Sequence, residues 1–183
     1  MNPLPDVLQT RLTELLELAD PSQEIYLVGG AIRNLLLGQP FKDLDFIVTK
    51  DGLNLARKVA DKNHGAFYLL DGQRGICRVL LGRGDNRIVL DFAAFQGNTL
   101  EDDLQNRDFT FNALAIDLRS PQKFIDPLRG AQDLVDKIVR LCSPYSIERD
   151  PVRMLRALRF ATELGGKLDK GVVDAIKANS RAL

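Results

Sequence analysis

The chain has 183 residues, 45% of them hydrophobic and 27% charged, which is typical of one globular domain or of one domain with the start of another. Lys and Arg number 25, as do Asp and Glu, so net charge gives no argument for a nucleic-acid partner. One histidine and two isolated cysteines argue against a histidine-based metal site, a Ser-His-Asp triad and a zinc cluster. Without a long apolar run or a signal-peptide pattern, we expect a cytoplasmic protein that does not enter membranes. The sequence identifies no protein partner.

Hydrophobic periodicity predicts mixed helices and strands over residues 1–142. Helices are expected at residues 7–18, 31–37, 53–62, 100–105 and 131–136. Strands are expected at residues 25–28, 44–49, 76–81 and 87–95, with the last two joined as a hairpin. Residues 111–117 fit a helix or a strand equally well.

The character of the chain changes at residue 143, where mostly helical sequence begins. Asp150 and Pro151 form a good helix start, the following apolar stripe ends at Gly165, and a last helix is expected at residues 170–178. We therefore expect one domain at 1–142 and the start of a helical domain at 143–183. Two helices are too few to bury a separate core. Either they pack on the first domain, or the chain ends partway through a larger helical region.

Two aspartates, Asp43 and Asp45, alternate along one predicted strand and so project from the same face. Paired carboxylates of this kind suit Mg²⁺, which prefers oxygen ligands, and phosphoryl-transfer enzymes often use two such ions. Asp91, at the end of a neighbouring strand, fits the place of a third carboxylate. The alternative is an exposed strand face with solvated aspartates.

A double glycine, Gly29-Gly30, precedes this strand and opens a short helix that contains Arg33. Glycines let the backbone approach a ligand closely, and Arg33 would add a charged contact to a phosphate. The pattern is neither a P-loop nor a dinucleotide fingerprint. A plain tight turn is the simpler interpretation of the two glycines alone.

Two later clusters combine charge with anchoring residues. In the first, Arg107, Asp108 and Asn112 would reach a ribose or a triphosphate while the intervening phenylalanines anchor the segment. In the second, Asp150 and Arg153 lie three apart on one helix face. Because an aspartate accepts from an exocyclic amine and an arginine donates to a ring acceptor, this pair would select adenine and cytosine. Arg156 and Arg159 follow on the same helix as further candidates for nucleotide binding.

Together these clusters resemble the class II tRNA nucleotidyltransferases of the DNA polymerase beta-like superfamily, which include CCA-adding enzymes and bacterial poly(A) polymerases. The resemblance spans roughly residues 25–165 and rests on four motifs: Gly29-Gly30-x-x-Arg33 with Asp43-x-Asp45, Arg107-Asp108-Phe109-Thr110-x-Asn112-Ala113, Asp126 to Gly130, and Arg149-Asp150-x-x-Arg153. It implies an α+β fold, with a palm built on a five-stranded mixed sheet and followed by the first helices of a neck. It also implies Mg²⁺-dependent addition of C, as CC or CCA, to the 3′ end of tRNA from CTP and ATP, with release of pyrophosphate.

The chain departs from the family pattern in four places. Asn106 stands where a second arginine often precedes the second motif, Arg129 replaces a glycine, and Arg149 stands where glutamate often begins the last motif. The segment 93–99 is short, as in members that add only CC. Two other functions stay open: a poly(A) polymerase on the same fold, and a nucleotide-binding head that is inactive without further helical domains.

Overall fold

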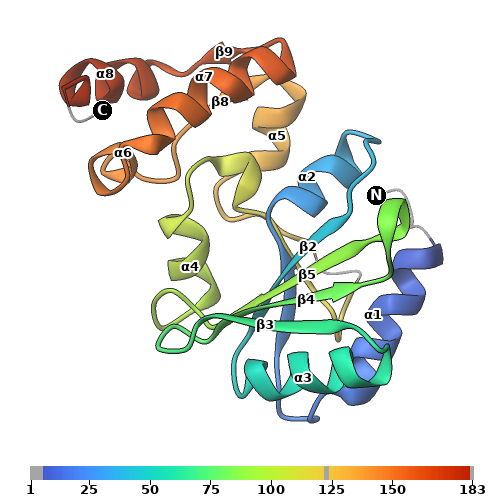
Figure 1. Ribbon diagram of the computed structural model, residues 1–183. Helices are drawn as coiled ribbons and strands as arrows, with labels where there is room; N and C mark the ends of the chain where they lie inside the picture. Colours follow the sequence, from blue (N-terminus) through green and yellow to red (C-terminus); the bar gives the residue numbers. More distant parts are fainter. Residues whose placement is uncertain (1–5, 122–123, 182–183) are drawn as a thin grey trace. The chain divides into compact units, whose positions relative to one another are not determined.

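The computed structural model describes residues 6–121 and 124–181. The chain forms two compact units, coloured along the sequence in Figure 1. Unit 1 comprises Met1–Phe95 and Ala115–Ile125, and unit 2 comprises Gln96–Leu114 and Asp126–Leu183. This division follows contacts within the fold, and the expected boundary between head and neck at residue 142 stays a prediction.

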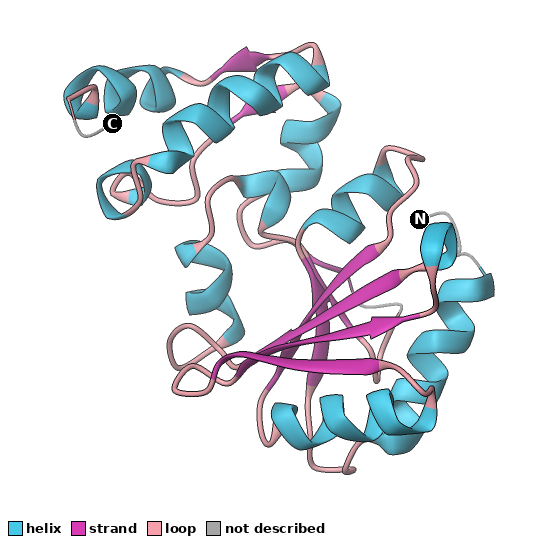
Figure 2. Ribbon diagram, in the orientation of Figure 1, coloured by secondary structure: helices cyan, strands magenta, loops and turns pink. Residues whose placement is uncertain are grey.

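Unit 1 is a mixed sheet with helices (Figure 2). Its helical elements are α1 (Asp6–Leu18), α2 (Gly30–Leu36), α3 (Gly52–Lys62) and the 3₁₀ turn η1 (Gly84–Asn86). Its strands are β1 (Ile25–Val28), β2 (Asp43–Val48), β3 (Ala66–Asp71), β4 (Ile76–Leu81), β5 (Ile88–Ala93), β6 (Ala115–Asp117) and β7 (Phe124–Ile125). The sheet order is β3-β4-β5-β2-β1-β6-β7, and only β2 and β5 pair in parallel. The α+β class is confirmed, but the sheet has seven strands where five were expected.

The two outer strands, β3 and β7, explain the difference. β3 is an edge strand in which three consecutive apolar residues, Tyr68, Leu69 and Leu70, are exposed. Its sequence therefore does not alternate between apolar and polar residues, which is the pattern that marks a half-buried strand. Its pairing with β4 is also irregular between Leu69 and Asp71. β7 has two residues and is too short for a periodicity to be recognised.

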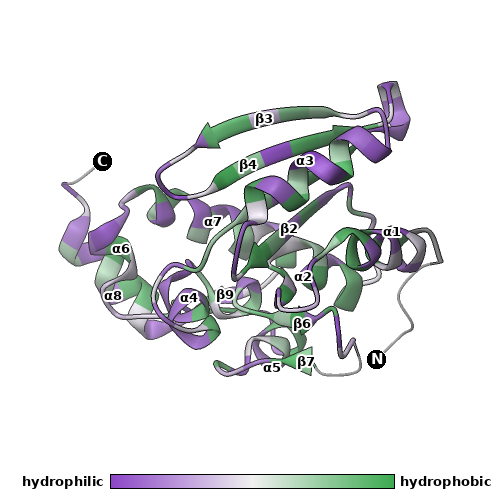
Figure 3. Cartoon of the chain, turned by 90° about the horizontal axis from the view of Figure 1, so that it is seen from below, coloured by the Kyte–Doolittle hydropathy of each residue, from purple (hydrophilic) through white to green (hydrophobic). Residues whose placement is uncertain are grey.

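One face of the sheet carries the core of unit 1. Leu44 and Phe46 on β2 are buried, and the Phe46 ring stacks on Phe92 of β5 with centroids 5.3 Å apart. Helix α3 contacts β3, β4 and β5 and also packs against α1. Figure 3 shows hydrophilic and hydrophobic residues alternating along α3, as expected for an amphipathic helix that covers a sheet. Because side chains alternate along a strand, the neighbours of Leu44 point to the opposite face.

Unit 2 is mainly helical. Its helical elements are α4 (Leu100–Asn106), the 3₁₀ turn η2 (Thr110–Asn112), α5 (Gly130–Val135), α6 (Ser146–Arg149), α7 (Val152–Leu164) and α8 (Lys170–Asn179). Two short strands, β8 (Ile138–Val139) and β9 (Lys167–Leu168), form a separate parallel sheet. The ambiguous segment 111–117 contains both kinds of structure, since η2 ends at Asn112 and β6 begins at Ala115. No helix in the described parts of the chain has the length and apolar character needed to cross a membrane.

An aromatic cluster forms the core of unit 2. Phe109 and Phe111 stack on each other with centroids 5.6 Å apart, and the edge of Phe160 from α7 contacts both rings at 5.5 and 5.2 Å. A second constraint comes from Gly130, where a Cβ atom would lie 2.0 Å from the carbonyl oxygen of Thr110. The phenylalanines therefore anchor the η2 segment as the sequence predicted, and α5 approaches it closely because residue 130 is glycine.

Candidate functional site

A row of charged side chains crosses the face of the sheet opposite Leu44 and Phe46. Asp45 on β2 is in register with Asp91 on β5, which is in register with Arg78 on β4. Asp43 lies two residues before Asp45 on the same strand and is exposed. The three predicted carboxylates thus occupy adjacent positions on one face, as their strand spacing indicated.

Arg78 was not predicted, and it binds the third carboxylate directly. Its Nε and Nη2 atoms donate to the two oxygens of Asp91, each at 2.8 Å. This bidentate hydrogen bond is the main cause that raises the pKa of Arg78, and the charges of Asp91, Asp43 and Asp45 add to it. Arg78 therefore neutralises one of the three negative charges in the row, and the role of Asp91 as a metal ligand stays a prediction.

The remaining donor set suits a magnesium ion. In residues 6–121 and 124–181, no three or more His, Cys, Asp or Glu side chains are grouped so as to hold a metal by themselves. Mg²⁺ does not need such a cage, because it is usually held by one or two carboxylates together with water and substrate phosphates. Asp43 and Asp45 provide two carboxylates on one face. The residues present therefore fit the expected ion.

The double glycine forms the turn between β1 and α2. Gly29 has φ 76° and ψ −138°, a conformation that residues with a Cβ rarely adopt. A Cβ at Gly30 would lie 3.5 Å from Nη2 of Arg33, which is ordinary van der Waals contact, so the guanidinium of Arg33 lies over the second glycine. Arg33 donates from Nε and Nη2 to Oδ1 of Asn34, at 3.1 and 2.9 Å. Val28, directly before this turn, is in register with Asp45, so in unit 1 the turn and the aspartates lie at the same end of adjacent strands.

Asp108 lies at the centre of the predicted site residues of unit 2. Its Oδ1 accepts from the N–H of Phe109 at 2.8 Å and from Nδ2 of Asn112 at 3.0 Å. Its Oδ2 accepts from Nε and Nη2 of Arg156, at 2.9 and 2.6 Å. Each of the two carboxylate oxygens thus accepts two hydrogen bonds within the protein. Asp108 holds η2 and α7 together, and its predicted contact to a ribose stays a prediction.

Arg107 is held in a similar way by an aspartate, Asp103, that was not among the predicted site residues. Asp103 is 3% exposed, and its Oδ2 accepts from Nε and Nη2 of Arg107 at 3.2 and 3.1 Å. Its Oδ1 accepts from the backbone N–H of Gln96 at 2.9 Å. This buried carboxylate fixes the start of the short segment before α4 and the direction of Arg107 at the same time.

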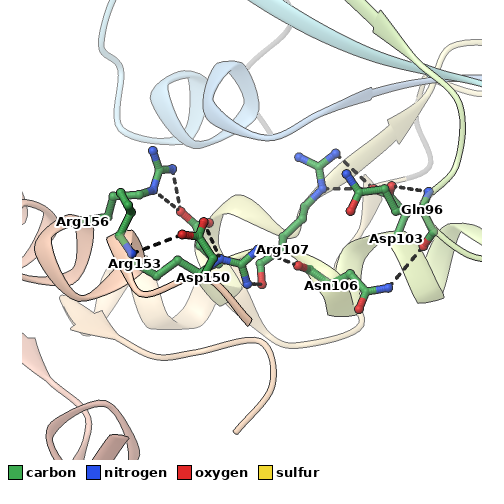
Figure 4. Close-up of a pocket in the computed structure, with 9 residues that line it drawn as sticks. Gln96, Asp103, Asn106, Arg107, Asp150, Arg153 and Arg156 are labelled. Atoms are coloured by element: carbon green, nitrogen blue, oxygen red, sulfur yellow. Dashed lines mark hydrogen bonds and ion pairs between the residues drawn. The ribbon is translucent and has the colours of Figure 1, made fainter. Parts of the chain in front are cut away.

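These side chains surround a cavity of about 380 Å³ within unit 2 (Figure 4). It is lined by Gln96, Asp103, Asn106, Arg107, Asp108, Asp150, Val152, Arg153 and Arg156. Nε of Arg153 lies 3.6 Å from Oδ2 of Asp150, so the predicted base-reading pair is adjacent. Oδ1 of Asp150 also accepts from the N–H of Val152 at 3.2 Å, although the capping position of α7 is occupied by Pro151 and not by Asp150 as predicted. Its other oxygen faces Arg153, so the contact with Val152 and the predicted base reading do not exclude each other.

Arg159 does not line this cavity. Its Nε lies 3.5 Å from Oε1 of Glu163 on the surface of α7, and its guanidinium lies over the Phe160 ring. Its predicted role in nucleotide binding remains a prediction.

Two departures from the family pattern contact each other. Nη1 of Arg149 donates to Oδ1 of Asn106 at 2.7 Å, although 43 positions separate the two residues. Asn106 in turn donates from Nδ2 to the carbonyl oxygen of Gln96 at 3.2 Å. The hydrogen bond between Arg149 and Asn106 thus joins α6 to the end of α4.

Residues 25–140 match the family described as the poly A polymerase head domain, and this match covers more than half of the chain. The chain belongs to this family. Its fold and its sequence agree on this point, because the matched residues include the glycine turn, the Asp43–Asp45 strand and the Arg107–Asn112 segment.

The curated relatives that resemble the chain include proteins with different products. A CC-adding tRNA nucleotidyltransferase of Geobacter sulfurreducens is 44% identical over 140 residues, which cover 76% of this chain and 32% of the relative. An A-adding tRNA nucleotidyltransferase of Aquifex aeolicus is 36% identical over 168 residues, which cover 83% of this chain and 20% of the relative. The specific nucleotide is therefore not settled by similarity.

A solved structure agrees with the fold over nearly the whole chain. A tRNA nucleotidyltransferase complexed with a primer tRNA and an incoming ATP analog has a TM-score of 0.79 and 32% sequence identity. The match covers 94% of this chain and 50% of that protein. The chain thus spans at most half the length of these three proteins.

Proposed function

We propose that this chain carries the catalytic head of a template-independent nucleotidyltransferase that adds nucleotides to the 3′ end of tRNA and releases pyrophosphate. The observation that carries this proposal is the arrangement of Asp43 and Asp45 on one face of β2, in register with Asp91, in a chain of the head-domain family. The relatives named above act on tRNA or are complexed with it, which supports tRNA as the partner.

The cofactor of the proposed reaction is Mg²⁺, held by Asp43 and Asp45. When bound, it would lower the pKa of the attacking 3′-hydroxyl and neutralise charge on the departing pyrophosphate. Asp91, kept in place by Arg78, would assist from the neighbouring strand. Gly29, Gly30 and Arg33 would bind the triphosphate through backbone N–H groups and a guanidinium.

The substrates in this proposal are CTP and ATP. Asp150 would accept a hydrogen bond from the exocyclic amine of the base, and Arg153 would donate to the ring acceptor beside it. Cytosine and adenine both present this pair of groups, whereas uracil and guanine present a carbonyl beside an N–H. Arg107, Asp108 and Asn112 would orient the ribose and the triphosphate, with Arg156 and Arg159 as further phosphate contacts.

Within this scheme we propose that the product is CC. The segment that follows β5 is short, and unit 2 fixes much of it to α4. Oδ2 of Asp102 accepts from the N–H groups of Asn98 and Thr99, at 3.0 and 3.1 Å, and Thr99 caps α4 in return. A segment held in this way is not the long flexible loop that complete CCA addition usually needs.

The experiment that tests the proposal is incorporation of each labelled nucleotide with Mg²⁺ into tRNA transcripts that end before CCA, after C and after CC. The proposal expects C on the first two transcripts and nothing on the third. A single A after CC would replace CC addition by CCA addition, and a run of A residues on any RNA would identify a poly(A) polymerase. Absence of incorporation with retained CTP binding would indicate a head that is inactive without further helical domains.

A further inference from the structure

The guanidinium of Arg153 is fixed by three oxygen atoms that lie outside its own helix. Nη1 donates to Oγ of Ser146 at 2.5 Å and to the carbonyl oxygen of Arg107 at 3.2 Å. Nη2 donates to the carbonyl oxygen of Asn106 at 3.0 Å. The two carbonyls belong to the end of α4, where backbone carbonyl groups have no partner within the helix and a cation is favourable.

Ser146 is the only side chain among these three acceptors, and it is 1% exposed. The capping position of α6 is occupied by Tyr145 and has no side-chain cap, so the Ser146 hydroxyl does not cap this helix. The hydroxyl also points toward the carbonyl oxygens of Arg107 and Asp108, both at 3.4 Å. A hydroxyl both donates and accepts, so Ser146 accepts from Arg153 and donates to the same backbone that Arg153 contacts. An alanine at this position would leave one N–H of Arg153 without its acceptor.

These contacts leave a defined remainder for a ligand. Arg153 has five N–H donors, and the three hydrogen bonds described use both donors of Nη1 and one of Nη2. Nε forms an ion pair with Oδ2 of Asp150 at 3.6 Å, which is too long for a hydrogen bond, so its N–H and one N–H on Nη2 remain for a nucleobase. Cytosine offers two acceptors, N3 and O2, next to its amine, and adenine offers N1. Uracil and guanine place an N–H where these bases have an acceptor, so a fixed donor meets a donor.

We propose that Ser146 is a positioning residue for base selection, because it fixes the Arg153 guanidinium against the end of α4 with two donors left for the base. This inference deepens the proposed function and rests on it for the identity of the ligand. A guanidinium held in one orientation rejects uracil, whereas one that can rotate about its side chain finds the carbonyl of uracil as readily as N3 of cytosine. Discrimination thus depends on a serine that does not itself line the cavity.

A purely structural role for Ser146 makes a different prediction. In that case removal of the hydroxyl lowers the stability of unit 2 and weakens the binding of all four nucleotides equally. In the positioning role, its removal changes the ratio of affinities for CTP and UTP, which a uniform loss of folded protein leaves unchanged. This ratio is therefore the deciding quantity, and it can be measured without RNA and without turnover.

The test is equilibrium binding of CTP, ATP, UTP and GTP to the 183-residue chain with Mg²⁺, for the wild type, Ser146→Ala and Ser143→Ala. Ser143 is the matched control, because its hydroxyl accepts from the N–H of Tyr145 at 3.4 Å and, among the described residues, forms no hydrogen bond with Arg153. Hydrogen bonds with a charged partner are stronger than neutral ones. We expect the CTP to UTP preference to fall about tenfold in Ser146→Ala, equivalent to about 1.4 kcal/mol. We expect it to stay unchanged in Ser143→Ala.

The inference is overturned if Ser146→Ala prefers CTP over UTP as strongly as the wild type does. It is also overturned if the wild type binds CTP and UTP equally. If Ser146→Ala does not fold, Ser146→Cys gives the same test, since it keeps the volume and offers a weaker acceptor, and a wild-type preference there is equally contrary. Selective binding that depends on Ser146, in a chain that fails to extend any tRNA, would retain the inference and indicate a head that is inactive without further helical domains.

Discussion

Two arginines of α7 pair with carboxylates that differ in solvent exposure. This difference predicts that replacing the two arginines lowers stability by unequal amounts. Arg156 makes two hydrogen bonds to Asp108, whose side chain is 9% exposed. Arg159, one turn later, pairs with Glu163, whose side chain is 53% exposed. The same substitution at both positions, Arg156→Gln and Arg159→Gln, therefore separates a buried carboxylate from a solvated one on a single helix.

The magnitudes follow from burial. Removing one partner of a fully buried ion pair costs about 3–5 kcal/mol. The Arg156 side chain is 43% exposed, so solvent screens the pair, and we expect Arg156→Gln to lower the free energy of unfolding by about 2 kcal/mol. Arg159→Gln loses a surface pair worth about 0.5 kcal/mol and a contact with the Phe160 ring worth about 0.5 kcal/mol. Its total loss is therefore at most about 1 kcal/mol.

Urea unfolding of the wild type and both variants, followed by far-ultraviolet circular dichroism, measures these losses. We expect the midpoint to fall clearly further for Arg156→Gln than for Arg159→Gln, with similar denaturant dependence. Equal losses of stability, or a larger loss for Arg159→Gln, would show that the ion pair between Arg156 and Asp108 does not stabilise unit 2 more than the surface pair does. A large change in denaturant dependence would instead indicate a change in the unfolded or native state.

The remaining predictions concern one side-chain pair and one thiol. Asn106→Arg alone places two guanidinium groups together and should destabilise unit 2 by about 1 kcal/mol, whereas adding Arg149→Glu should restore stability through an ion pair. A double variant no more stable in urea than Asn106→Arg would refute this linkage. Burial raises the pKa of the Cys77 thiol from 9.0 to about 11, so between these pH values the unfolded state loses its thiol proton while the folded state keeps it. The contribution of this thiol to the free energy of unfolding is complete below pH 9. It should fall, by at most about 2.7 kcal/mol, as the pH rises to about 11. The difference in unfolding free energy between wild type and Cys77→Ala should shrink over this range, and a constant difference would contradict the assignment.

The inner strands and the aspartate face were predictable because their residues obey simple periodicities. Leu44, Phe46 and the two aspartates between and before them alternate, which places both carboxylates on one face without any knowledge of the partner strands. β3 was missed because it lies at an edge, where exposed apolar residues on both faces hide the pattern. Edge strands are shaped by solvent and by irregular pairing as much as by the core.

The contacts that complete the sites could not be predicted, because they join distant parts of the chain. Arg78 reaches Asp91 through the register of two strands, and no local pattern states that register. Ser146 and Asn106 lie 7 and 47 positions from Arg153, and nothing in a serine or an asparagine marks it as a partner of that arginine. What the sequence marked was the charged residue of each pair, while the partner emerged only from the fold.

Asp43 and Asp45 are proposed to support metal-dependent nucleotide transfer. The most direct measurement is the rate at which Asp43→Ala and Asp45→Ala add labelled CTP, with Mg²⁺, to a tRNA transcript that ends before CCA. Asp43 is exposed and Asp45 is partly exposed, so we expect both variants to fold, with unchanged circular dichroism spectra. We expect transfer to be abolished in both variants. Near-normal transfer by either variant would contradict this proposal.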